Sequence, residues 1–298
     1  MSLFLVYSLV AALSYGTSDF FGGLASRRLN VLHATAGTYV VATIAVGIGL
    51  VAVGGEWTVD AVLFGLIAGL LAIVGFVAFY AALAIGPMSL LSPAIALVGG
   101  VVPVGVAAAM GESLGVIHWI AIAVAIIATV LISVPSTRSA ERVTPRVAVL
   151  ALVAGLGLGG SVVAIDFTQE SSGLVPAMVE MVVGVVVLLG ILAILRITRA
   201  RFGLLAIFEP PPALARQGFS SRRAWGYAAV AGVLLGVSNS LIVLALHAGN
   251  LAIVSVLVSL YPLATVVLAA AVLREKLSFV QLGGIVLAIG ACVALALA

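Results

Sequence analysis

Residues Tyr80–Val134 read YAALAIGPMSLLSPAIALVGGVVPVGVAAAMGESLGVIHWIAIAVAIIATVLISV, which is three apolar runs separated by the breaks GP and GES. A similar pattern returns from Val243 to the C-terminus. The matching residues keep one constant spacing, and they include the pairs Gly86 and Gly249, Ser92 and Ser255, and Glu112 and Glu275. Identical residues at a fixed offset, with both breaks in register, indicate a duplicated unit.

The composition places the chain in a membrane. Hydrophobic residues make up 64% of it and charged residues 8%, whereas a soluble domain is about 25% charged. The N-terminus lacks the positive region and cleavage pattern of a signal peptide, so we interpret it as a membrane span. The single cysteine, Cys292, lies in an apolar run and is expected to be a buried thiol. A net charge of +3 gives no reason to expect nucleic acid as a partner.

The apolar runs predict ten membrane-spanning helices, since about 20 apolar residues cross the bilayer core as a helix. The predicted spans are Leu3–Ala25, Val31–Val53, Ala61–Ile85, Met88–Met110, Leu114–Val134, Arg146–Thr168, Leu174–Leu195, Trp225–Leu246, Leu251–Leu273 and Leu277–Leu297. Continuous runs of this length exclude the alternating pattern of an outer-membrane barrel.

The basic residues predict the orientation. All 13 Lys and Arg residues lie in the links that follow odd-numbered spans, and the links on the other side contain none. Because basic loops stay in the cytoplasm, both termini are predicted to lie outside. The polar stretch 135–145 separates the spans into a first unit, 1–134, and a second unit, 146–298, and is predicted to be a cytoplasmic linker.

Five spans per unit is an odd number, so two such units in tandem insert with opposite orientations. The predicted fold class is therefore an all-α membrane protein with ten transmembrane helices in two inverted five-helix repeats. Inverted repeats are a common construction of secondary transporters, in which the substrate site lies between the halves near the middle of the membrane.

The pattern resembles the drug/metabolite transporter superfamily in its ten-span form with two EamA-type domains. The resemblance covers nearly the whole chain. The motifs that carry it are Ile85-Gly86-Pro87 and its counterpart Ala248-Gly249-Asn250, Gly111-Glu112-Ser113 and its counterpart Arg274-Glu275-Lys276, the small-residue segment Ser14–Phe20, and Gly159-Gly160-Ser161. The resemblance implies a metabolite carrier in the cell membrane, often an exporter of amino acids or related compounds, with a central cavity between the repeats. Members are usually drawn with cytoplasmic termini, whereas the arginines of this chain predict the reverse.

Three acidic residues within the spans are candidates for binding a proton or a substrate. A charged group inside a span costs roughly 2.5–3.5 kcal/mol on insertion scales and therefore needs a reason. Glu180 lies two turns into the seventh span and could titrate or bind a substrate amine; alternatively, it is protonated and bonded to a neighbouring helix. Asp19 could face a cavity, or it could pair with Arg27 or Arg28. Asp166 could face a cavity, or it could lie at a solvated helix end.

Polar and aromatic residues within the spans are weaker candidates for the same site. Tyr15, Tyr80 and Tyr261 lie in the first, third and ninth spans. Asn239, in the middle of the eighth span, could bind a substrate carboxylate or amide, or it could bond between helices.

Proline and glycine bear on the mechanics of the bundle. Pro103 and Pro262 occur in equivalent spans, and each permits a kink that could be static or could bend the helix in gating. Glycines at i and i+4 let helices approach closely and are expected to report packing. These pairs are Gly65 and Gly69, Gly155 and Gly159, and Gly232 and Gly236.

No phosphate-binding loop, HExxH motif or GxSxG motif occurs, and three His with one Cys are too few for a typical zinc site. We therefore expect no catalytic residues, no metal and no cofactor. The sequence predicts a secondary active transporter, an exporter of amino acids, related compounds or drugs, working by alternating access with possible proton coupling. The alternatives are an uncoupled facilitator, and an intramembrane enzyme or a non-transporting receptor subunit. Its partners would be a small-molecule solute and the bilayer, and a homodimer remains open.

Overall fold

The computed structural model describes residues 3–26, 28–85, 88–112, 114–132, 134, 145–197, 221–273 and 277–297. The helices are α1 (Leu3–Ser26), α2 (Val31–Val53), α3 (Val59–Ile85), α4 (Met88–Ala109), α5 (Val116–Ile132), α6 (Pro145–Asp166), the 3₁₀ turn η1 (Glu170–Ser172), α7 (Val175–Ile197), α10 (Ser221–Ala248), α11 (Leu251–Val258), α12 (Pro262–Leu273) and α13 (Phe279–Leu297).

These helices confirm the ten predicted spans, with α11 and α12 together forming the ninth. Seven helical segments among the described residues are long and apolar enough to cross a membrane, and α4, α5 and α13 supply shorter apolar helices. Large apolar side chains cover the outside, as at Ile48 and Val186, which are 67% and 64% exposed. Such a surface suits lipid and not water.

Side chains at the helix ends explain where several spans begin. The Asn30 side chain accepts a hydrogen bond from the Leu32 N–H at the start of α2. Before α13, the Gln281 N–H donates to Ser278 Oγ and the Ser278 N–H donates to Gln281 Oε1. This reciprocal capping box satisfies backbone N–H groups that a helix start leaves without partners.

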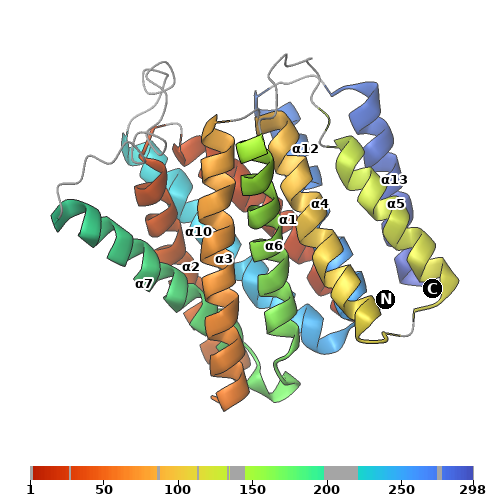
Figure 1. Ribbon diagram of the computed structural model, residues 1–298, viewed down its shortest axis with the longest axis horizontal. Coiled ribbons are helices and arrows are strands. Elements are labelled where there is room, and N and C mark those ends of the chain that lie inside the picture. Colours follow the sequence, from red (N-terminus) through yellow and green to blue (C-terminus); the bar gives the residue numbers. More distant parts are fainter. Residues whose placement is uncertain are drawn as a thin grey trace.

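The helices contact one another in a pattern that repeats between the two halves, α1–α5 and α6–α13. In the first half, α1 and α2 contact α10, and α4 contacts α6. In the second half, the equivalent helices α6 and α7 contact α3, and α11 and α12 contact α1. The remaining main contacts join equivalent helices, α2 with α7, α4 with α11, and α5 with α13. Exchanging the halves leaves this pattern unchanged, as expected of inverted repeats. Figure 1 shows α5 and α13 side by side at one end of the bundle and α7 at the other.

The glycine pairs lie where helices pack closely against each other, which confirms their predicted role in packing. A Cβ added to Gly69 in α3 would lie 2.7 Å from Val183 Cβ in α7. A Cβ added to Gly236 in α10 would lie 2.7 Å from Ala45 Cβ in α2. These two interfaces are equivalent under the exchange of the halves, so both halves use small residues for the same contact.

The two prolines differ in their effect. The ninth span was predicted as one helix, but it is broken between α11 and α12, and Pro262 is the first residue of α12. Around the break, the Tyr261 N–H donates to the Val258 oxygen, because Pro262 has no N–H to offer that carbonyl. Helix α4 continues through Pro103 without a break.

Several predicted features lie outside the described residues. They are the break Gly86-Pro87, the motif Arg274-Glu275-Lys276, the linker at 135–144 and the long basic link at 198–220.

Candidate functional site

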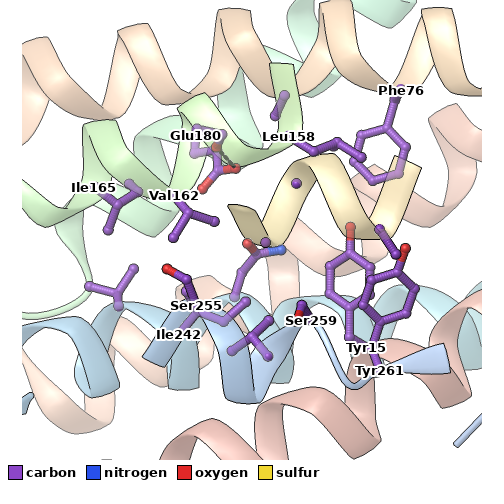
Figure 2. A pocket seen from close by; sticks show the side chains of 18 of the residues that line it. Tyr15, Phe76, Leu158, Val162, Ile165, Glu180, Ile242, Ser255, Ser259 and Tyr261 are labelled. Carbon is purple, nitrogen blue, oxygen red and sulfur yellow. Dashed lines mark hydrogen bonds between the residues drawn. The ribbon is translucent and has the colours of Figure 1, made fainter. Parts of the chain in front are cut away.

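A cavity lies between the two halves of the bundle. Its walls come from α1, α2, α3 and α4 of the first half and from α6, α7, α10, α11 and the segment after α11 in the second. Among the described α-helices, α5, α12 and α13 contribute nothing to these walls. The cavity volume is about 90 Å³; a single water needs roughly 10–15 Å³, so there is room for several waters or part of a small solute. Figure 2 shows the cavity from close by.

Glu180 is the acidic residue on this wall. It comes from α7, is 6% exposed, and its Oε1 accepts a hydrogen bond of 3.0 Å from Ser161 Oγ in α6. Ser161 belongs to the predicted motif Gly159-Gly160-Ser161. The hydroxyl can donate to the charged or the neutral carboxyl, so it orients Glu180 in either protonation state. Glu180 is also the only Asp, Glu, Lys or Arg among the described lining residues.

Two tyrosines from opposite halves meet at another part of the wall. The rings of Tyr15 in α1 and Tyr261, between α11 and α12, have centroids 5.0 Å apart and are tilted by 54°. Both side chains line the cavity, and Figure 2 shows them side by side. The break before Pro262 sets the position of Tyr261. Asn239 in α10 also lines the cavity, and its amide group donates to the Leu235 oxygen of the preceding turn.

Ser255 in α11 is a site residue that the sequence reasoning did not select. Its side chain lines the cavity and is 4% exposed, and Oγ has no hydrogen-bond partner among the described residues. A buried hydroxyl without a partner is costly, so this group is suited to a solute or a water. The signal was present in the sequence, because Ser255 and Ser92 are matched by the duplication.

Asp19 lies outside the cavity, in a separate chamber of about 40 Å³ between α1, α2, α3 and α10. Tyr39 and Phe76 line both spaces, and their rings meet edge to face with centroids 5.8 Å apart. This aromatic pair therefore forms the wall between the chamber and the cavity.

Asp166 does not lie with Glu180 on the cavity wall. Asp166 is the last residue of α6, close enough to Glu112 for the two charges to act on each other. The Tyr80 side chain lies outside the described residues. The acids Asp19, Asp166 and Glu180 thus occupy three different places. A catalytic cluster of these acids, which the enzyme alternative required, is therefore not formed.

Glu112, a residue of the predicted motif after the fourth span, holds the other half of the bundle. Its Oε1 accepts from the Leu251 N–H at 2.9 Å and its Oε2 from the Ala252 N–H at 3.3 Å. Both N–H groups belong to the first turn of α11, where a carboxylate is favoured by unpaired donors and the helix dipole. This cap anchors the helix that carries Ser255.

A larger hollow, of about 600 Å³, lies between α2, α7 and α10. Its walls are apolar except for His33 near the start of α2 and the edge of Trp225. Figure 1 shows α7 tilted away from its neighbours. The polar groups gather at the smaller central cavity, so the smaller space is the better candidate for recognition.

The fold and cavity define a class of proteins, the membrane carriers built from two repeated helical halves. The profile of the EamA-like transporter family matches residues 2–134 and again residues 145–297, and the chain belongs to this family. A solved structure described as "Crystal structure of protein" superposes with a TM-score of 0.73 at 16% identity, covering 99% of this chain and 96% of that one. No curated protein sequence matches this chain.

The family resemblance drawn from the sequence is therefore confirmed. The protein is a multi-pass membrane protein of a family that transports small solutes and is not a family of enzymes.

Proposed function

We propose that this protein is a secondary active exporter of a small organic metabolite, such as an amino acid, a related compound or a drug. The solute binds in the central cavity, and Glu180 couples its movement to a proton. The observation that carries the proposal is a buried carboxyl group on the wall of a cavity built from both halves.

Glu180 is suited to this role by where it lies. A carboxylate inside a membrane span is costly, so a solute amine or a proton is needed to neutralise it. If both bind at the same carboxyl, each displaces the other, and a proton gradient then drives the solute outward. Tyr15, Tyr261, Asn239 and Ser255 supply the hydroxyl and amide groups that would fix the solute's orientation.

The two halves give a route to alternating access. The ninth span is broken before Pro262, whereas its equivalent α4 is continuous through Pro103. We propose that the opposite state exchanges these conformations, so that the two prolines are gating positions. The repeats would be joined by 135–145, with the basic links in the cytoplasm and both termini outside.

The test uses purified protein in liposomes with an imposed pH gradient and a panel of labelled metabolites and dyes. Glu180→Gln keeps the shape and a bond to Ser161 but cannot titrate, so we expect it to lose gradient-driven flux while still folding. Glu170→Gln, at an exposed residue of η1, is the matched control and should transport normally.

The same experiment separates the alternatives. Flux in Glu180→Gln equal to that of the unmodified protein would remove Glu180 from the mechanism. Solute counterflow that ignores the pH gradient in the unmodified protein would identify an uncoupled facilitator.

A further inference from the structure

The chamber around Asp19 has features that the proposed exporter mechanism does not use. Asp19 lies about two turns before the end of α1, inside a span. It makes no hydrogen bond or ion pair with the residues that the structure describes, among which Arg27 is not included. An ionised carboxyl in that position carries a cost of roughly 2.5–3.5 kcal/mol. It therefore needs a counter-charge or a proton.

Besides the Tyr39 hydroxyl, the other polar groups of the chamber are four serine and threonine hydroxyls that already donate their hydrogens. Ser18 donates to the Ala231 oxygen, Ser26 to the Gly22 oxygen, Thr35 to the Val31 oxygen and Thr38 to the Ala228 oxygen. All four residues line the chamber with Asp19. Because each hydroxyl has only one hydrogen, what these residues can still offer a ligand is oxygen lone pairs.

A carboxylate with several hydroxyl oxygens is a donor set for a small hard cation. The chamber volume of about 40 Å³ fits one such ion with a water or two, since a water needs roughly 10–15 Å³. The chamber is too small for the organic solute proposed for the central cavity. We propose that this chamber is a binding site for a small hard cation, sodium, held by Asp19 and the hydroxyls of α1 and α2.

The position of the chamber connects this cation to the central cavity. Tyr39 and Phe76 form the wall between them, and the Tyr39 ring lies against Gly184, one turn after Glu180 on α7. The Asp19 charge also acts on Tyr261 of the cavity wall. A cation bound to Asp19 therefore changes the electrostatic potential at the solute site. It also lies next to the Tyr39 and Phe76 rings that the two spaces share.

The described titratable groups on the elements around Asp19 include Tyr15 of α1, Arg28 beyond its end, His33 and Tyr39 of α2, and Arg222, Arg223 and Tyr227 of α10. Tyr261 of the cavity wall is also within reach of the Asp19 charge. The described residues of the spans around the chamber and the cavity include two carboxyl groups away from helix ends. These are Asp19 and Glu180. A test of pH dependence at Asp19 is therefore made with Glu180 replaced by glutamine.

The experiment measures thermal unfolding of the purified protein in detergent, with sodium chloride replaced by choline chloride at constant ionic strength. Sodium should raise the midpoint of Glu180→Gln, and Asp19→Asn added to it should weaken the apparent affinity by about tenfold or more. Protection by acidic pH only when Asp19 is present, with no effect of sodium, would show that Asp19 takes a proton instead.

A matched pair on α2 keeps the test decisive if Asp19→Asn does not fold. Thr35 and Thr43 each donate to the carbonyl four residues earlier, at 2.8 Å, but only Thr35 lines the chamber. Thr35→Val should raise the half-saturating cation concentration about two- to tenfold, and Thr43→Val should leave it unchanged.

Either of two results would overturn the proposal. One is a midpoint that does not depend on sodium, as expected if Asp19 is neutralised by Arg27 or by a proton. The other is a cation effect of equal size with and without Asp19, or with Thr35→Val and Thr43→Val. Neither result touches solute flux through Glu180, so the exporter proposal stands or falls separately.

Discussion

Replacing Gly236 by alanine tests the close contact between α10 and α2. The added Cβ would lie 2.7 Å from the backbone oxygen of Ala42 and 2.7 Å from Ala45 Cβ. Contacts shorter than about 3 Å require something to move, and here one of the atoms is backbone. The helices must therefore move apart along an interface that both halves of the molecule repeat.

The magnitude follows from a comparison within one helix. Gly226 is also in α10, and a Cβ built on it meets nothing within 4 Å. Gly226→Ala gains helix propensity, about 0.8–1 kcal/mol, with no overlap. Gly236→Ala gains a similar amount but carries overpacking of about 1–3 kcal/mol. The propensity contribution cancels in the difference, so we expect Gly236→Ala to be less stable than Gly226→Ala by about 1–3 kcal/mol.

The assay is reversible unfolding in mixed micelles of a mild detergent and dodecyl sulfate, followed by helical circular dichroism. Solute binding to the folded state should weaken in the same variant, since α10 also carries Asn239 of the cavity wall. Equal stability of the two alanine variants would refute the reasoning, because it would show that α10 and α2 do not approach each other this closely.

Three further outcomes are expected. Glu112→Ala leaves two N–H groups of α11 without an acceptor and should destabilise the protein by about 1–3 kcal/mol, whereas Glu56→Ala, at an exposed residue, should not; equal melting of the two would contradict the cap. Ser255→Ala removes a buried hydroxyl that has no partner among the described residues, so solute binding should weaken by about two- to tenfold while the protein is as stable as before or more so; unchanged solute binding would remove Ser255 from the site. In a Cys292→Ser background, an impermeant thiol reagent added outside whole cells should label Glu56→Cys but not Ser221→Cys. The reverse labelling would invert the proposed orientation.

The linear features of this protein were predictable from the sequence. Span length and apolar content determine what crosses a bilayer, so the ten spans follow with bounds close to those observed. The duplication is visible as matching residues and breaks, and an odd number of spans per unit makes the repeats inverted. An acid inside an apolar run is conspicuous for the same reason, so Glu180 stands out in the sequence.

The convergence of side chains was decided by the tertiary structure. Asp19 and Glu180 look alike in sequence, yet the pair Tyr39 and Phe76 separates the spaces that they line. The role of Glu112 as the cap of α11 depends on a contact between the two halves. In a transmembrane sequence nearly all residues face away from water, so the apolar pattern does not show which side of a helix is packed against another helix. Which face of each helix meets which neighbour is set by close packing between small residues, and that packing joins positions far apart in the chain.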